Sequence, residues 1–526
     1  MYDVLFAGGC IIDGSSRPRF QADVAISGDT IAAVEPAIAK NHAREFIDIT
    51  GFYLTPGFVD LHTHSDFPLL LDARALSFAY QGVTTQVIGN CGFGPAPLNR
   101  PEDLRRNVFC FKEPYTPTWT DSQGFLHYMS ERPFGTNIAV LVGHGALRSW
   151  AVGYENRPVT EFEQRKMRNE LSQAMTNGAF GLSSGLEYAP GINADDAEIA
   201  ALCSTVAEHG GLYTTHVRNR DIDFESGFSE AFRAARNSGV KLQISHAVPK
   251  YGASAHAATW LLDALRTERA ATDVAGDVIP YEWGPTSLSV ILPPKMLKSE
   301  PAQIAQMLES SQVRQAIIEQ EKPFWLLLRD RRWEDILLYY SITYPHLMGK
   351  NAHEIGEYFN TDPFNGLLSV LQGERSAMFS ALIMGRIKSR SDLEQILTDP
   401  AIGVISDAMS LATDGPLGDV IWSPGCFGWV PHYFAEFVGE GKLLDLETGV
   451  YKITGFPAER LGLTDRGIVR QGAKADLAIF HPSAIADRAS IATPQRYAAG
   501  FKYVMCNGGF VVKGGEFAEQ LHGTLL

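Results

Sequence analysis

Two histidines separated by one residue, His62 and His64, follow the apolar run Phe58-Val-Asp-Leu61. Side chains two residues apart in a strand point to the same side, so both imidazoles can face one point. Imidazole nitrogen is a common ligand of zinc and of similar borderline metals. A pair of this kind also occurs by chance or for structural reasons, so the pair alone is weak support for a metal site.

Further ligand-type residues follow later strand-like runs of the chain. A thiol, two more imidazoles and a carboxylate stand at such ends, and together with the first pair they form a ligand set for one or two ions. A single buried histidine is more often a packed core residue. Ligand types that recur at the same end of successive strands are harder to explain in that way. The sequence therefore predicts a metal centre, with zinc as the expected ion, formed by His62, His64, Cys91, His216, His246 and Asp407.

The middle of the chain alternates short strand-like runs with helical patterns. The clearest helix follows Thr160, which forms a capping box with Glu163 and precedes an apolar stripe at helical spacing. Repeated strand-then-helix units predict an α/β fold, a TIM-like (β/α)₈ barrel with its active site at the carboxyl ends of the strands. The strand candidates are Thr84–Gly89, Asn137–Gly143, Ala179–Leu182, Gly211–Thr215, Val240–Ser245, Phe324–Leu328 and Gly403–Ser406.

Both ends of the chain consist of short strand-like runs with turn residues between them. We expect residues 1–55 and 465–526 to form one small β-sandwich domain, because chain termini often lie close together. Residues 56–464 would then be the barrel, with a helical insertion around 295–400 that has few strand signals. This insertion is either a lid over the barrel mouth or a helical excursion without a role at the site.

Composition limits the class of partner. The chain of 526 residues has 45 Lys and Arg against 60 Asp and Glu, a formal charge of −15. This balance argues against a nucleic-acid or anionic-membrane partner, because both require surplus positive charge. No apolar stretch is long enough to cross a bilayer, and no basic region precedes an apolar run at the start, so we expect a cytoplasmic protein. The six cysteines are scattered, which indicates no disulfide framework.

The motifs around these residues resemble the amidohydrolase superfamily and, within it, the N-acyl-D-amino-acid deacylases (D-aminoacylases). The similarity runs almost from end to end, and Asn90-Cys91-Gly92-Phe93 is its most specific part. The matching stretches are Pro56–Asp66, Gly89–Pro97, Val142–Arg148, Gly178–Gly191, Thr215–Arg218, Ile244–His246, Pro280-Tyr281 with Thr286–Leu288, and Ser406-Asp407.

The resemblance implies a role for each of the ligand-type residues. His62 and His64 would bind one metal and His216 and His246 the other. Cys91 would bridge the two or belong to the tighter site, and one zinc ion can suffice in such centres. Asp407 would contact the first metal and act as general base.

The expected reaction is hydrolysis of a small-molecule amide by a metal-activated hydroxide. Asp407 would take the proton from water and return it to the departing nitrogen. Tyr281 would donate a hydrogen bond to the developing oxyanion or hold the substrate. The resemblance places Tyr188 and Ser287 in the substrate pocket. His144, which follows a strand, is either a support for the site or faces substrate.

The chain departs from the family at two positions that hold a substrate carboxylate. The family's lysine after the last metal histidine is Val248 here, and its arginine after the catalytic aspartate is Gly425. Either Lys250 or an arginine such as Arg218 substitutes, or the substrate has no carboxylate there. Nearby aromatics favour a larger, less charged, aryl-bearing amide. These aromatics are Tyr281, Trp283, Trp422, Phe427, Trp429 and Tyr433.

Three functional classes remain from the sequence. The first is a zinc-dependent hydrolase of non-peptide carbon–nitrogen bonds of the deacylase type. The second is a hydrolase of cyclic amides, ureides or carbamates, whose carbonyls the same chemistry can attack. A non-catalytic binding or assembly protein would be expected to have lost ligands, and here they are all present. The sequence leaves open whether the chain is a monomer or a homo-oligomer.

Overall fold

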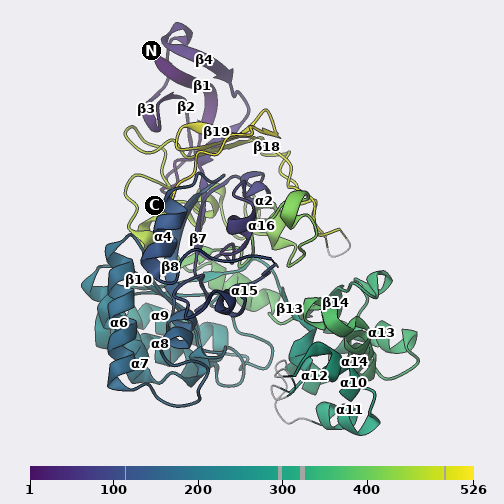
Figure 1. Ribbon diagram of the computed structural model, residues 1–526. Coiled ribbons are helices and arrows are strands. Elements are labelled where there is room, and N and C mark those ends of the chain that lie inside the picture. Colours follow the sequence, from purple (N-terminus) through teal and green to yellow (C-terminus); the bar gives the residue numbers. More distant parts are fainter. Residues whose placement is uncertain (113, 294–295, 297–298, 320–325, 491–492) are drawn as a thin grey trace.

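A computed structural model describes residues 1–526 apart from 113, 294–295, 297–298, 320–325 and 491–492 (Figure 1). Its central sheet has eight strands in the order β16-β12-β11-β10-β9-β8-β7-β6, and every pair is parallel. The two outer strands also meet, because the Asp407 amide donates to His62 O (3.1 Å) and the His64 amide to Ala408 O (2.8 Å). The sheet therefore closes into a barrel. The strands are β6 (Phe58–Asp60), β7 (Val83–Ile88), β8 (Asn137–Gly143), β9 (Gly181–Gly185), β10 (Leu212–His216), β11 (Lys241–Ile244), β12 (Val274–Val278) and β16 (Ile402–Val404).

Helices follow the barrel strands and pack around them, which confirms the predicted (β/α)₈ fold. The capping box of α6 forms as expected, with the Thr160 hydroxyl accepting from the Glu163 amide and Glu163 from the Thr160 amide. The helices of this ring are α2 (Leu76–Ala79), α4 (Ser122–Ser130), α5 (His144–Ala151), α6 (Glu161–Thr176), α7 (Asp196–Glu208), α8 (Phe224–Ser238), α9 (Ala257–Glu268), α15 (Arg390–Leu397) and α16 (Gly425–Phe437). Shorter helices are α1 (Pro68–Leu71), α3 (Leu104–Asn107), α17 (Leu446–Tyr451) and α18 (Gly455–Leu461).

One predicted barrel strand is wrong and one was missed. In the Phe324–Leu328 candidate, residues 324–325 lie outside the described part of the chain, and Leu326–Arg329 is a helix, α12. The missing barrel strand is β12, which is fully buried although Gly276 and Asp277 interrupt its apolar pattern. Asp277 is tolerated there because its carboxylate accepts hydrogen bonds from Gln243 Nε2 and from the His246 amide.

Strands from both ends of the chain form a second, nine-stranded sheet in the order β20-β19-β18-β17-β5-β1-β2-β3, with β4 beside β1. Phe6 of β1 contacts Tyr503 and Phe510 of the distant strands β18 and β19, so the two halves of the sheet pack face to face. Figure 1 shows this sheet stacked at one end of the barrel. The strands are β1 (Tyr2–Ile11), β2 (Phe20–Ser27), β3 (Thr30–Glu35), β4 (Ala43–Asp48), β5 (Tyr53–Pro56), β17 (Leu477–Phe480), β18 (Phe501–Cys506), β19 (Gly509–Lys513) and β20 (Glu516–Phe517).

The insertion between β12 and β16 contains a three-stranded antiparallel sheet as well as helices. The sequence had indicated few strands here; each strand has only five residues. The insertion has a hydrophobic core of its own and stands beside the barrel in Figure 1. Its elements are β13 (Trp283–Ser287), α10 (Pro301–Met307), α11 (Ser311–Ile318), α12, β14 (Ile336–Tyr340), α13 (Ala352–Tyr358), α14 (Pro363–Glu374) and β15 (Leu382–Arg386).

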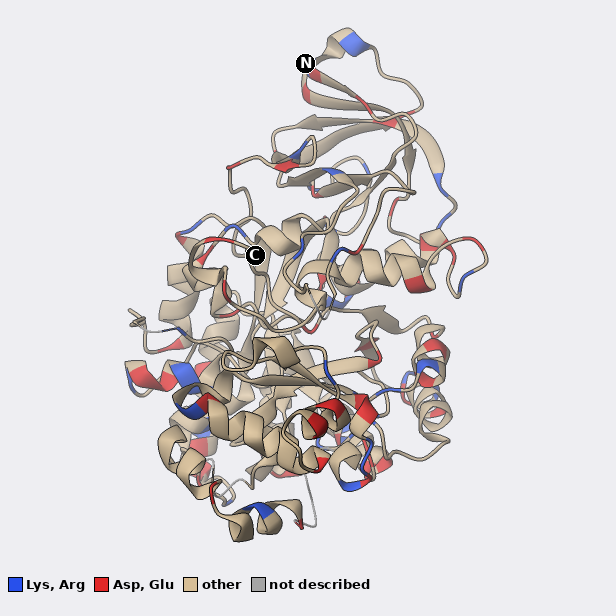
Figure 2. Ribbon diagram, turned by 90° about the vertical axis from the view of Figure 1, so that its right-hand side faces the viewer, with Lys and Arg blue, Asp and Glu red and all other residues tan. Residues whose placement is uncertain are grey.

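Acidic and basic residues are interspersed over the helices and loops of the molecule (Figure 2). In the described part of the chain, no helix combines the length and apolar character needed to cross a membrane.

Candidate metal centre

The barrel brings the predicted ligand residues together in two groups that share Cys91. His62, His64, Cys91 and Asp407 form one group, and Cys91, His216 and His246 form the other, with the donor atoms of each group within 4.8 Å of one another. His62 and His64 follow β6, Cys91 follows β7, His216 ends β10, His246 follows β11 and Asp407 follows β16. The residues meet because the carboxyl ends of parallel barrel strands lie at one face.

The spacing of the donor atoms suits shared metal ions. The Cys91 sulfur lies 3.2 Å from His62 Nε2, 3.7 Å from His216 Nδ1 and 3.5 Å from His246 Nε2. Asp407 Oδ1 lies 3.0 Å from His64 Nε2 and 3.4 Å from His62 Nε2. Ligands of one tetrahedral zinc ion lie about 3.3–3.7 Å apart, given bond lengths of about 2.1 Å to nitrogen and 2.3 Å to sulfur.

Three of these residues adopt the left-handed backbone conformation that residues other than glycine rarely use. The φ angles are 53° at Cys91, 40° at His246 and 50° at Asp407. Such conformations cost about 1–3 kcal/mol each and persist only where surrounding contacts impose them. The Asp277 carboxylate accepts from the His246 amide (2.6 Å), and the Asp60 carboxylate accepts from the amides of His62 and Ser406 (both 3.2 Å). These carboxylates hold the backbone on either side of the donor groups.

Burial keeps the imidazoles of His62, His216 and His246 neutral and so able to bind a metal. It lowers the pKa of His62 to about 3. Burial, together with the charge of Arg220, lowers the pKa of His216 to about 4 and also lowers that of His246. A neutral imidazole keeps the lone pair that a metal requires.

The two acidic ligands also fit a cation. Burial, with a contribution from Asp407, raises the pKa of the Cys91 thiol well above its usual value. The thiol would therefore lose its proton only beside a positive ion such as a bound metal. Burial would also raise the pKa of Asp407, but the hydrogen bond from His64, with electrostatic contributions from His62 and Arg220, outweighs it and holds that pKa below its usual range. Buried thiol, neutral imidazoles and an ionised carboxylate together match the ligand set of zinc.

His216 has a further partner that the sequence did not reveal. Its Nε2 atom lies 2.6 Å from Glu187 Oε2, and the same carboxylate accepts from Lys250 Nζ at 2.8 Å. Glu187 stands in the Gly178–Gly191 motif, but its role depends on contacts made across the barrel mouth. A carboxylate on the second ring nitrogen fixes the orientation and protonation of a metal-binding histidine.

A cavity of about 210 Å³ opens beside the donor groups, between the barrel and the insertion. Of the predicted aromatic residues, Tyr281, Trp283 and Trp422 line it. Phe427, Trp429 and Tyr433 do not; they are buried among apolar side chains, because α16 turns them into the core. Phe93, Phe109, Thr286 and Met384 also line the cavity, so the insertion forms part of its wall.

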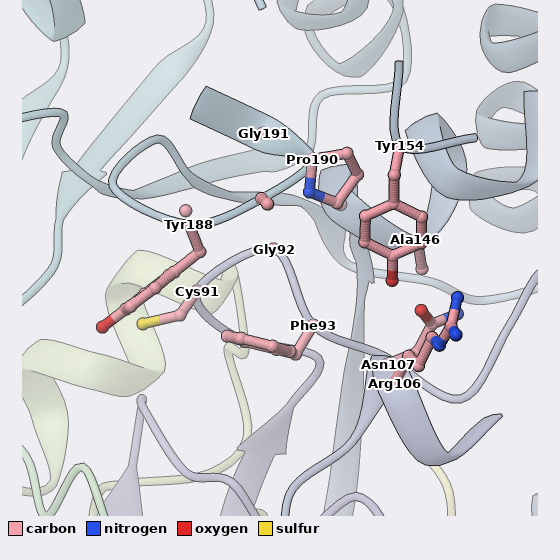
Figure 3. A pocket seen from close by; sticks show the side chains of 13 residues that line it. Cys91, Gly92, Phe93, Arg106, Asn107, Ala146, Tyr154, Tyr188, Pro190 and Gly191 are labelled. Carbon is pink, nitrogen blue, oxygen red and sulfur yellow. The ribbon is translucent and has the colours of Figure 1, made fainter. Parts of the chain in front are cut away.

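The predicted substrate residues differ in their positions. Tyr188 lines the cavity, and its ring packs edge-on against His216. Figure 3 shows a smaller adjoining pocket, which Tyr188 and Cys91 both line. The buried Tyr281 hydroxyl has no hydrogen-bond partner among the described residues. Ser287 does not line the cavity; its hydroxyl lies 2.7 Å from that of Ser289 at the end of β13.

His144 lies outside both donor groups. Its Nε2 atom lies 2.7 Å from Glu198 Oε1, and Arg148 Nε donates to the same carboxylate at 3.1 Å. All three side chains are buried. Arg148 also donates to the backbone carbonyls of Glu155 and Arg157, so this network fixes the loop after α5.

Comparison with known proteins identifies the family. A family model described as amidohydrolase family (Amidohydro_3) matches residues 45–280 and 406–512. The chain belongs to the amidohydrolase family. It is 31% identical to a D-aminoacylase of Alcaligenes xylosoxydans xylosoxydans over 533 residues, covering 100% of this chain and 97% of the relative. This confirms the predicted class, a metal-dependent hydrolase of non-peptide carbon–nitrogen bonds.

Two solved structures resemble the amidohydrolase over its full length. One is a D-aminoacylase with a binuclear metal centre, in which one metal activates the enzyme and a second attenuates it (TM-score 0.79, 29% identity, 100% of both chains). The other is N-acyl-D-glutamate deacylase of Bordetella bronchiseptica with zinc and a phosphonate mimic of the tetrahedral intermediate (TM-score 0.80, 27% identity, 100% of this chain and 99% of that chain). The family model leaves residues 281–405 of this amidohydrolase unmatched, and the insertion lies within them.

Proposed function

We propose that this amidohydrolase is a zinc-dependent deacylase of N-acylated amino acids, with Asp407 as its general base and acid. The observation that carries the proposal is the position of the Asp407 carboxylate, which contacts His62 and His64 and also lines the cavity. The relatives named above are a D-aminoacylase and an N-acyl-D-glutamate deacylase, which favours substrates of the D configuration.

Each of the two donor groups would bind its own metal ion. His62, His64 and Asp407 would hold one ion, and His216 and His246 the other, with Cys91 shared between them. When bound, zinc supplies Lewis acidity, which polarises an amide carbonyl and makes water more acidic. The zinc complex of the Bordetella relative supports this choice of metal.

The residues of the chain supply the proton transfers and the orientation of substrate. Asp407 is ionised at neutral pH, so its carboxylate can accept a proton from the attacking water and return it to the leaving nitrogen. Tyr281 has a buried hydroxyl without a partner among the described residues, and it can donate a hydrogen bond to the substrate carbonyl oxygen as charge develops there. The aromatic walls reduce the access of water to these groups.

The proposal is tested by assaying zinc-loaded protein with N-acyl-D-amino acids and their L enantiomers. We expect equal amounts of free amino acid and carboxylic acid to be released from the D series. The Asp407→Asn variant should retain its metal and lose this activity. Failure of the zinc-loaded protein to hydrolyse any N-acylated amino acid would overturn the proposal, as would full activity of Asp407→Asn.

A further inference from the structure

The cavity contains more positive charge than its carboxylates balance. Arg220, Lys250 and Lys388 all line it, beside the donor groups. They come from different parts of the fold: Arg220 from the loop after β10, Lys250 from the loop after β11, and Lys388 from the end of the insertion. A cation that is already paired with a carboxylate of the protein is not available to an anionic ligand, so the partners of these three residues determine what the cavity can bind.

The two cations considered from the sequence are both ion-paired within the protein. Lys250 Nζ contacts both oxygens of Glu187, at 2.8 and 2.9 Å. Arg218 binds Glu230 through two nitrogens and donates to the carbonyls of Ile192 and Ala194, and it does not line the cavity. Neither is placed to be the main partner of a substrate carboxylate.

Arg220 makes no ion pair with any carboxylate in the described part of the chain, although it is only 6% exposed. One guanidinium nitrogen lies 2.7 Å from His246 Nδ1, and the other lies 3.4 Å from His216 Nε2. Its Nε atom is buried without a hydrogen-bond partner among the described residues. The charged guanidinium thus contacts the rings of His246 and His216 and also lines the cavity, and its Nε–H remains available as a donor.

Lys388 is the second cation without a counter-ion among the described residues, and it is only 4% exposed. Its Nζ atom donates to the backbone carbonyl of Tyr281 at 3.0 Å. Burial, and then the charge of Arg220, lower the pKa of Lys388 to about 7. Lys388 follows β15, in the part of the chain that the family model does not match.

Two neighbouring buried cations without a counter-ion are unfavourable by themselves, because desolvation and mutual repulsion both raise their energy. An anion that enters the cavity removes both costs. The aromatic walls, which include Trp283 and Trp422, strengthen the attraction by excluding water. A carboxylate suits this position, since a guanidinium and an ammonium offer several donors to its two oxygens.

We propose that Arg220 and Lys388 form the binding site for a carboxylate on the substrate amide. They would take over the function that the cations missing at Val248 and Gly425 have in related deacylases. The inference rests on the proposed deacylase function and names its substrate class as acylated amino acids or other amides with an acidic group. One imidazole ring separates Arg220 from the metal-facing Nε2 of His246, so the carboxylate would lie beside the reacting amide.

The test compares an N-acetyl amino acid with its neutral carboxamide on zinc-loaded protein. We expect the wild type to prefer the acid, and Lys388→Met and Arg220→Met each to raise KM for the acid by about 10- to 100-fold, the usual effect of losing a charge-assisted hydrogen bond. The KM for the carboxamide should stay within about threefold. Arg233→Met, which removes an exposed arginine paired with Asp196 on α7, is the matched control and should change neither.

A binding measurement separates this inference from the proposed function. The probes are 4-phenylbutyrate and 4-phenylbutanol, neither of which has an amide, and binding is measured by calorimetry. Weaker binding of the acid to Lys388→Met, with unchanged binding of the alcohol, supports the carboxylate site even if no amide is hydrolysed. Equal binding of the acid to wild type and both variants, or a wild type that prefers the carboxamide, overturns it while the deacylase function stands. Zinc content is measured for each variant, because Arg220 contacts two metal-binding histidines.

Discussion

His216 and Glu187 are joined at 2.6 Å through the ring nitrogen of His216 that faces away from Cys91. With a proton on Nε2, His216 donates to Glu187 and keeps the lone pair of Nδ1 for a metal. Glu187 is at the same time the counter-ion of Lys250. One carboxylate therefore fixes a candidate metal ligand and neutralises Lys250, so that among the described residues lining the cavity Arg220 and Lys388 are the cations without a carboxylate partner.

Replacing Glu187 by glutamine should weaken metal binding by about 10- to 100-fold, since the carboxylate that orients His216 is lost. Zinc affinity is measured by competition with a chelating dye. Glu230→Gln is a suitable control, because Glu230 pairs with Arg218 away from the donor groups. Unchanged zinc affinity in Glu187→Gln would show that His216 is held by other contacts.

Replacing Asp407 by asparagine should lower kcat by about 10²- to 10⁴-fold, the usual contribution of a general base. The side chain keeps its size, so the thermal unfolding temperature should change little. Zinc content must be determined in the same sample, because Asp407 is also a candidate ligand. A large fall in kcat with zinc retained would assign the loss to proton transfer.

The affinity for an acidic substrate should fall as pH rises above about 7. The pKa of Lys388 is lowered to about 7 by burial and by Arg220, so its positive charge is present below that pH and is lost above it. The charge of Asp407 raises the pKa of Lys388, and the charge of Lys250 lowers it. A bound substrate carboxylate would raise this pKa further, so the loss of affinity would begin at a higher pH. The measurement is KM for an N-acyl amino acid between pH 6 and about 9.

In Lys388→Met, KM for the N-acyl amino acid should no longer rise with pH. In the wild type, KM for the neutral carboxamide should not change over the same pH range. A KM that rises equally for acid and carboxamide would assign the titration to another group of the site.

Replacing Gly185 by alanine should destabilise the fold by about 1–3 kcal/mol, the usual cost of overpacking. A Cβ atom at this position would lie 2.0 Å from the backbone oxygen of Cys91, so the loop that presents the thiol must move. Unfolding by urea and zinc affinity are the two measurements. Gly94→Ala is the control, because its Cβ would meet nothing closer than 3.5 Å.

The grouping of the ligand-type residues could be predicted from the sequence because each stands at or just after the end of a barrel strand. His62, His64, Cys91, His216, His246 and Asp407 are far apart in the chain, but the carboxyl ends of parallel strands meet at one face whatever the lengths of the connections. The barrel itself was predictable from repeated strand and helix patterns. The pattern failed at β12, where buried Asp277 is stabilised by hydrogen bonds that only the assembled barrel provides.

The substrate side of the cavity depended on tertiary contacts. Sequence order alone does not show that Lys250 pairs with Glu187, or that Lys388 returns from the insertion to lie near Arg220. Nor does it show that Thr286 rather than Ser287 lines the cavity, since that depends on which face β13 turns inward. The chain by itself therefore determined the fold and the grouping of the ligand-type residues, which follow from local pattern and strand ends. Only the tertiary structure decided which charges are neutralised, because the partner of each charged group comes from a different part of the chain.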